Sequence, residues 1–194
     1  QLPRAGIVHR LDKDTSGVMV VARSLEAHAA LVEALQARAV KREYLAIAQG
    51  RLTAGQTIDA PIARHPVDRK RMAVREEGKE AVTHFTVRER YPAHSLIDVR
   101  LETGRTHQIR VHLAWLKHPL LGDPVYGGRF HVPAGVSDAL REALGRFRRQ
   151  ALHARRLSFD HPISGEPVVF EAPVPRDMSR MIELLRADAA SRDG

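Results

Sequence analysis

The sequence predicts an α+β protein in which a mainly antiparallel mixed sheet is flanked by helices and loops. Two observations carry this expectation. Predicted strands, which are apolar and β-branched, follow one another in runs and hairpins. Predicted helices, which have apolar residues at helical spacing, do not alternate regularly with these strands. The length of 194 residues suits one compact domain, and a hydrophobic fraction of 43% excludes a disordered chain.

The pattern up to residue 50 predicts two short strands, a helix and a longer strand. Residues 7–11 and 17–22 are rich in apolar, β-branched side chains and flank a polar turn. Ser24 is placed to cap a helix that runs to about Arg38. The buried stripe of this helix is expected to be four apolar residues at helical spacing, Leu25, Ala29, Val32 and Leu35. Residues 43–49 then return to an extended conformation.

Residues 51–80 are expected to form a long basic excursion that contains short strands. Its cations are Arg64, Arg69, Lys70, Arg71, Arg75 and Lys79. Residues 82–90 and 95–102 predict the two strands of an antiparallel hairpin. The second strand alternates, and the face that starts at Leu96 is expected to be the wetter one.

The rest of the chain predicts three helices and a late strand. Thr106 can cap the first of these helices. Its apolar side is formed by Ile109, Leu113 and Leu116. Residues 137–147 predict a second helix, residues 168–172 a strand, and residues 178–185 a final amphipathic helix.

The charge of the chain points to a polyanionic partner. Lys and Arg number 31 against 23 Asp and Glu, which gives a formal net charge of +8. Such an excess favours binding to nucleic acid. The chain has no cysteine, which excludes disulfides, thiolate metal sites and cysteine nucleophiles and fits a cytoplasmic location. No apolar run of the sequence is long enough to cross a bilayer.

The usual cofactor and metal patterns are missing from the sequence. It contains neither a Walker loop nor a Gly-x-Gly-x-x-Gly turn, and no Gly-x-Ser-x-Gly elbow of a serine hydrolase. Among the 11 histidines, His107 and His112 are five residues apart, not the four that would bring both rings to one helix face. We therefore expect no cofactor and no metal.

Three polar clusters are candidates for a functional site. Residues 6–17 place charged side chains between two apolar segments, which is typical either of a functional loop or of a salt-bridged turn. Residues 104–110 put cations and amides at a predicted helix start, which suits an anion but also fits a solvated helix end. Residues 149–156 are basic and can equally form a charged surface.

Five segments in order resemble the RluA-type family of RNA pseudouridine synthases, and the resemblance runs through almost the whole chain. They are residues 6–17, 41–46, 104–112, 118–127 and 150–154. His-Arg-Leu-Asp at 9–12 and Gly-Arg-Thr-His-Gln-Ile-Arg at 104–110 are its most specific parts. Further details resemble the subgroup that acts on large-subunit ribosomal RNA. These details lie at residues 64–66, 72–74, 149–154 and 161–165.

The resemblance implies the pseudouridine synthase catalytic fold and an enzyme that isomerises specific uridines in large-subunit (23S) ribosomal RNA. In that reaction the target base is flipped out, the N1–C1′ bond breaks, and C5 joins C1′. The chemistry depends on an aspartate and needs neither a redox cofactor nor a metal. The expected protein is a cytoplasmic monomer with ribosomal RNA as its partner. A non-catalytic RNA-binding or ribosome assembly module on the same fold is the alternative.

The resemblance also implies the catalytic residues. Asp12 matches the essential aspartate, as nucleophile or as base at the ribose, although Asp14 faces the same way on periodicity alone. Arg110 matches the arginine that pairs with this aspartate, and Arg105 is the alternative pairing candidate. Tyr44 matches the active-site tyrosine and would stack on the extruded uracil.

RNA contacts are expected around these groups. Arg10 resembles the side chain that enters the space left by the flipped base, and the basic excursion is expected to grip the RNA backbone. The expected RNA-binding residues are Arg10, Arg64, Arg69, Lys70, Arg71, Arg105, Thr106 and His107. Members of the family carry an earlier strand with a Lys-Pro-x-Gly-like signature and often an S4-type RNA-binding domain. Residues 1–194 are therefore expected to be the catalytic domain without these parts.

Overall fold

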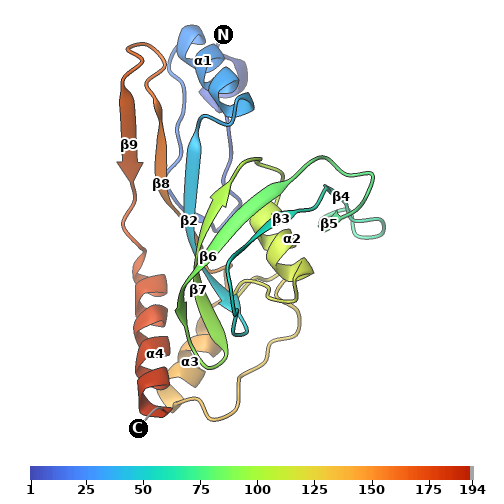
Figure 1. Ribbon diagram of the computed structural model, residues 1–194, viewed down its shortest axis with the longest axis vertical. Coiled ribbons are helices and arrows are strands. Elements are labelled where there is room, and N and C mark those ends of the chain that lie inside the picture. The colour runs from blue at the N-terminus through green and yellow to red at the C-terminus, as the bar shows by residue number, and fades with distance from the viewer. Residues whose placement is uncertain (193–194) are drawn as a thin grey trace.

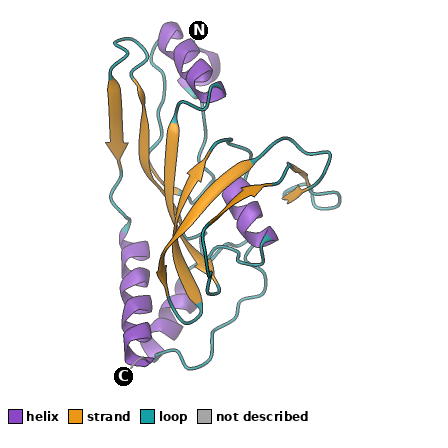
Figure 2. Cartoon of the chain, viewed as in Figure 1, coloured by secondary structure: helices purple, strands orange, loops and turns teal. Residues whose placement is uncertain are grey.

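The computed structural model describes residues 1–192, and its centre is a seven-stranded sheet (Figures 1 and 2). The strand order is β1-β8-β2-β7-β6-β3, and β9 pairs with β8. The strands are β1 (Ser16–Gly17), β2 (Lys41–Gln49), β3 (Gln56–Asp59), β6 (Val82–Arg90), β7 (His94–Leu101), β8 (Leu152–Asp160) and β9 (Pro167–Glu171). Among the strands of residues 1–192, only β1 and β8 pair in parallel, which confirms the mainly antiparallel mixed sheet.

A second, two-stranded sheet and the helices surround the main sheet. The small sheet pairs β4 (Ile62–Arg64) with β5 (Met72–Val74) and projects away from the main sheet beside α2 (Figure 1). The helices are the short 3₁₀ helix η1 (Pro3–Gly6), α1 (Leu25–Gln36), α2 (Gln108–Trp115), α3 (Asp138–Arg146) and α4 (Arg176–Arg192). Within residues 1–192, no helix is both long and apolar enough to cross a membrane.

The central strand β2 separates two cores because its successive side chains point to opposite faces of the sheet. Ala46 packs on one face in a cluster with Ile109 and Leu113 of α2. Leu45 and Ile47 pack on the other face, against α3 and α4. The sheet therefore holds α2 on the face opposite the C-terminal helices, and the candidate functional clusters gather on the α2 side.

Two predicted helix starts agree with the structure and one does not. Ser24 accepts a hydrogen bond from the amide of Ala27 at 3.1 Å, and Ser137 caps α3 in the same way at 3.3 Å. The predicted cap at Thr106 is wrong. The residue before α2 is His107, which has a left-handed φ of 57° and makes no side-chain cap bond.

The predicted buried stripe of α1 is only partly right. Leu35 packs against a cluster that includes Phe159 of β8, but Leu25 is 62% exposed, and the other contacts of the helix with this cluster come from Ala27, Leu31 and Ala34. Two stripes at helical spacing exist on this helix, and local periodicity does not say which one the sheet covers.

Local periodicity also fails to predict the buried face of β7. Leu96, expected on the wetter face, is 1% exposed because α3 and α4 cover that end of the strand.

The N-terminal loop and β8 differ most from expectation. The two predicted strands at 7–11 and 17–22 are reduced to β1 and a single bridge between Ile7 and Val21. The segment 149–156, whose plain interpretation was a charged surface, leads into β8 in the middle of the sheet, and Ala151 is fully buried. The sheet thus brings this segment directly under the N-terminal loop.

Candidate active site

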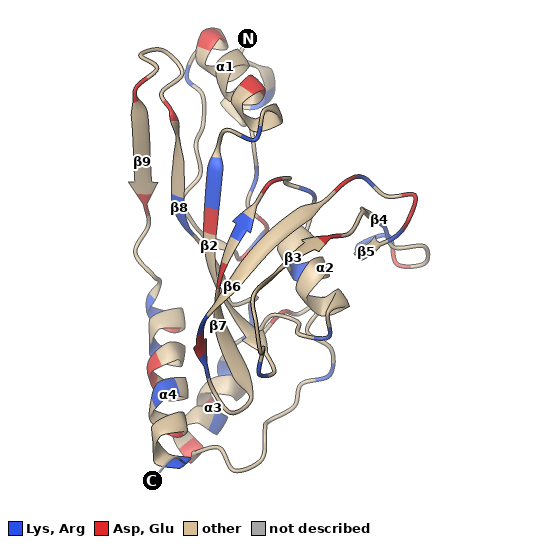
Figure 3. Cartoon of the chain, viewed as in Figure 1, with Lys and Arg blue, Asp and Glu red and all other residues tan. Residues whose placement is uncertain are grey.

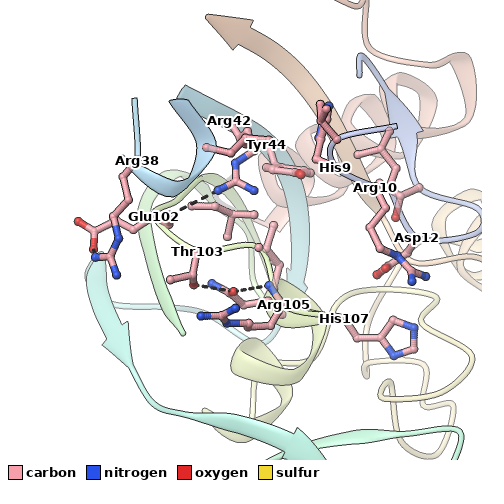
Figure 4. A pocket seen from close by; sticks show the side chains of 18 of the residues that line it. His9, Arg10, Asp12, Arg38, Arg42, Tyr44, Glu102, Thr103, Arg105 and His107 are labelled. Atoms are coloured by element: carbon pink, nitrogen blue, oxygen red, sulfur yellow. Dashed lines mark hydrogen bonds and ion pairs between the residues drawn. The ribbon is translucent and has the colours of Figure 1, made fainter. Parts of the chain in front are cut away.

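A cavity of about 540 Å³ lies between the N-terminal loop, β2 and the segment from β7 to α2 (Figure 4). The predicted site residues that line it are Arg10, Asp12, Tyr44, Arg105 and His107. Figure 4 shows Arg10 and Asp12 on one side of this space and Tyr44 with Arg42 along β2 on another. Three segments that are remote in sequence therefore meet around one volume.

Asp12 sits in a tight turn that β8 and the residues before it hold in place. The turn is closed by the amide of Thr15, which donates to the carbonyl of Asp12 at 3.0 Å. Gln150, 1% exposed, donates from Nε2 to the carbonyl of Lys13 at 2.7 Å and to Oγ1 of Thr15 at 3.0 Å. Asp14 has a φ of 69° and is exposed outside the cavity lining, whereas Asp12 lines the cavity.

Behind Asp12, Arg110 is held by two carboxylates. Its Nη1 donates to Oδ2 of Asp12 at 3.3 Å. Its Nε and Nη2 donate to the two oxygens of Asp123 at 2.8 and 2.9 Å. Burial alone would lower the pKa of Arg110, but these carboxylates raise it above its ordinary value, so the guanidinium is charged.

Asp123 is a functional-site residue that sequence reasoning missed. Its side chain is fully buried, and the backbone amides of Val125 and Tyr126 donate to it at 2.9 and 3.0 Å. Burial raises its pKa, but the hydrogen bonds from Arg110 and from these two amides, together with the charge of Arg110, outweigh burial and lower the pKa below the ordinary value. The segment 118–127 contained the signal, because it was one of the five segments of the family resemblance.

Tyr44 presents a neutral phenol to the cavity. The residue is 6% exposed, and burial raises its pKa to about 12, with the charge of Asp12 adding to the rise and that of Arg42 opposing it. A buried aromatic ring beside a carboxylate offers a flat apolar surface for a planar base. The structure thus brings Asp12, Arg110 and Tyr44 together, as expected.

Tyr126 connects the small sheet to this group. Its hydroxyl accepts a hydrogen bond from the amide of Met72 at 2.9 Å and contacts Nδ1 of His107 at 2.6 Å. The guanidinium groups of Arg71 and Arg110 lie 5.3 and 5.1 Å from the centre of its ring. Arg71, predicted as an RNA contact, therefore makes a cation–π contact with Tyr126.

The remaining predicted RNA contacts surround the cavity rather than line it. Arg69 and Lys70 are exposed on the turn of the β4–β5 hairpin, and Arg64 donates to the carbonyl of Arg69 at 3.3 Å (Figure 3 colours these cations blue). Thr106 lines a second hollow, between this hairpin and the residues before α2. Arg105, which does line the cavity, does not pair with Asp12. Its Nε donates to the carbonyl of Glu80 at 2.7 Å.

The side chains in the described range do not assemble a metal centre. No group of three or more His, Cys, Asp or Glu residues in positions 1–192 is arranged to hold an ion. The chemistry available at the cavity is that of an ionisable carboxylate beside a fixed cation and an aromatic ring. Such a set suits attack or proton transfer at a sugar carbon.

Proteins of known family share this sequence and fold. A family model described as RNA pseudouridylate synthase matches residues 1–115. Ribosomal large subunit pseudouridine synthase D of Xanthomonas campestris pv. campestris is 60% identical over 189 residues, which are 97% of this chain and 57% of that protein. The protein of the same name from Escherichia coli strain K12 is 57% identical over 96% of this chain and 57% of its own length. The chain thus spans less than two thirds of these curated relatives.

Solved structures give the same assignment. Human RNA Pseudouridylate Synthase Domain Containing 4 superposes with a TM-score of 0.74 at 28% identity, over 92% of this chain and 75% of that one. Human RNA Pseudouridylate Synthase Domain Containing 1 gives a TM-score of 0.69 at 27% identity, over 93% and 79%. With more than half of the residues matched by the family model and the fold shared, the chain belongs to the RNA pseudouridylate synthase family.

Proposed function

We propose that this protein isomerises specific uridines to pseudouridine in large-subunit (23S) ribosomal RNA. The observation that carries the proposal is that Asp12 and Tyr44 line one cavity, with Arg110 paired to Asp12 behind it, in a chain of this family. The substrate class is supported by curated relatives named for the large ribosomal subunit, at 57–60% identity. On this proposal residues 1–194 form a catalytic domain that acts as a monomer in the cytoplasm, where the ribosomal RNA is.

Asp12 is the catalytic carboxylate in this proposal. It acts at the ribose of the extruded uridine, either by attacking C1′ or by removing a proton from the sugar. Along both routes the N1–C1′ bond breaks, the freed uracil turns, and C5 bonds to C1′. On the first route the bond between Asp12 and C1′ breaks as C5 bonds to C1′, and on the second Asp12 returns the proton to the sugar. The proton on C5 is then lost and N1 gains one, so the product is an isomer of the substrate. The ion pair with Arg110 holds the Asp12 carboxylate in place until the sugar arrives.

The target uridine reaches Asp12 only after it has left the RNA stack. Tyr44 stacks on the extruded base, and Arg10, which lines the cavity beside Asp12, enters the space that the base leaves. Arg64, Arg69 and Lys70 hold the RNA backbone outside the cavity, and Arg105, Thr106 and His107 hold it at the cavity mouth. The net charge of +8 supports this electrostatic grip.

The decisive experiment maps pseudouridine after incubation with unmodified ribosomal RNA. New pseudouridine at defined positions of the large-subunit RNA, absent with the Asp12→Asn variant, is the expected result. RNA binding without any isomerisation would instead support the non-catalytic RNA-binding or ribosome assembly module. Cleaved RNA would indicate a nuclease and contradict both.

A further inference from the structure

Arg42 is a buried cation without an acidic partner. It is 8% exposed, almost as buried as Arg110, which is 4% exposed. Arg110 makes ion pairs with Asp12 and Asp123, but no Asp or Glu among residues 1–192 lies within salt-bridge distance of Arg42. Its guanidinium donates from Nη2 to the carbonyl of Glu102 at a long 3.4 Å, and its buried Nε has no partner within the described range.

The neighbours of Arg42 supply no compensating charge. His9 lines the same cavity and accepts a hydrogen bond from the amide of Val20 at Nε2, 3.0 Å. Burial and then the charge of Arg42 lower the pKa of His9 to about 4, so its ring is neutral at pH 7. Tyr44, two residues along β2 on the same face, is a neutral phenol. Burial lowers the pKa of Arg42 itself below that of an ordinary arginine.

The fold also leaves open space for this guanidinium. Gly104 begins the Gly-Arg-Thr-His stretch, and a Cβ built on it would collide with Nη1 of Arg42 (Figure 4 shows Arg42 opposite Thr103 and Arg105). A glycine at this position therefore leaves room for the guanidinium of Arg42 at the cavity wall. Placing an unpaired charge here costs folding free energy, and a ligand of opposite charge removes that cost.

We propose that Arg42 is the binding site for a backbone phosphate of the extruded uridine. The inference rests on the proposed function and extends it to a second anchor, inside the cavity, in addition to the hairpin that holds the flanking RNA. A guanidinium binds a phosphate through two parallel hydrogen bonds, and in RNA the phosphates are the anions. A uracil carbonyl is neutral and would leave the charge of Arg42 uncompensated.

The test compares binding of uridine, uridine 5′-monophosphate and uridine 3′-monophosphate to the protein by NMR titration. The wild-type protein should bind one of the monophosphates at least tenfold more tightly than uridine. Arg42→Met, which keeps the aliphatic length, should lose this preference, and Arg42→Lys should retain part of it. Gly104→Ala, which displaces the guanidinium, should weaken it as well. Arg146→Met, at a residue of α3 whose side chain is 80% exposed, is the matched control and should keep it.

Thermal unfolding provides a second readout. Because Arg42→Met removes an unpaired buried charge, we expect its Tm to be equal to or above that of the wild type. A preference for the monophosphate that survives in Arg42→Met, or no preference in the wild type, would overturn the inference. Since nucleotide binding is measured without turnover, either result is distinct from a failure to form pseudouridine in ribosomal RNA, which would refute the proposed function instead.

Discussion

Arg110 and Asp123 form a two-point ion pair behind Asp12, the proposed catalytic carboxylate, with N–O distances of 2.8 and 2.9 Å. The contact from Arg110 to Asp12 is longer, 3.3 Å, and uses one atom. Asp12 can therefore turn to a substrate without leaving the buried arginine unpaired. The pair with Asp123 fixes the plane of the guanidinium, and the Asp123 carboxylate compensates most of the positive charge of Arg110.

The two aspartates of the N-terminal turn should separate cleanly by mutation. Asp12→Asn keeps the size of the side chain but removes the carboxylate, so isomerisation should fall to background while RNA affinity stays near the wild-type value. Asp14→Asn is the matched control at an exposed position two residues away and should retain turnover. Pseudouridine mapping measures both, and turnover by Asp12→Asn with loss in Asp14→Asn would show that the assignment is wrong.

Removal of the Asp123 charge should damage both stability and catalysis. Asp123→Asn leaves Arg110 buried with one weak partner, a change that typically costs about 3–5 kcal/mol. Glu142→Gln breaks a surface pair with Arg146, whose side chain is 80% exposed, and should cost at most about 1 kcal/mol. Denaturant unfolding compares the two variants, and equal losses would contradict the role given to Asp123.

The β4–β5 hairpin should set the salt dependence of RNA binding. Arg69→Ala with Lys70→Ala should lower the slope of log affinity against log salt by about 0.7–0.9 per lost phosphate contact. Arg146→Ala with Arg180→Ala changes the net charge equally on α3 and α4 and should leave the slope unchanged. An unaltered slope in the hairpin variant would mean that the hairpin is only a solvated surface.

Acid should destabilise the protein in a range set by its buried histidines. Burial lowers the pKa of His94 to about 4, although the charge of Asp188 opposes the shift. Between pH 6.5 and about 4 the unfolded chain therefore binds more protons than the folded one, so stability falls as the pH falls. His94→Gln should remove up to about 3 kcal/mol of this dependence, measured by denaturant unfolding at several pH values. An unchanged pH slope in this variant would contradict the buried neutral state.

Turnover should need no added metal or cofactor. The chain has no cysteine, and residues 1–192 hold no cluster of metal-ligating side chains. Activity on a short RNA whose structure is stable without divalent ions should therefore survive a strong chelator. Activity that is lost in chelator and restored by zinc, but not by magnesium, would reveal a metal site.

Sequence patterns predicted the positions of helices better than they predicted which face of a helix or strand is buried. The cap residue Ser24 could be identified because the bond its side chain makes lies within three residues of it. The buried side of α1 could not, because Leu25 and Leu31 are both apolar and the choice depends on where β8 and β9 lie. The strand β8 was hidden for a similar reason, since its arginines are typical of a surface until the sheet surrounds it.

The sequence by itself determined the chemistry of this protein: its family resemblance, its basic charge, and the residue types Asp12, Tyr44 and Arg110. Tertiary structure decided which charges are paired. Asp12 and Arg110 are 98 residues apart, and Gln150 holds the turn of Asp12 from 137 residues beyond Lys13. Whether a buried arginine has a counterion, as Arg110 does and Arg42 does not, depends on which distant segments the sheet brings together. Electrostatic interactions in a buried site follow from distance and desolvation, and neither is encoded in local spacing.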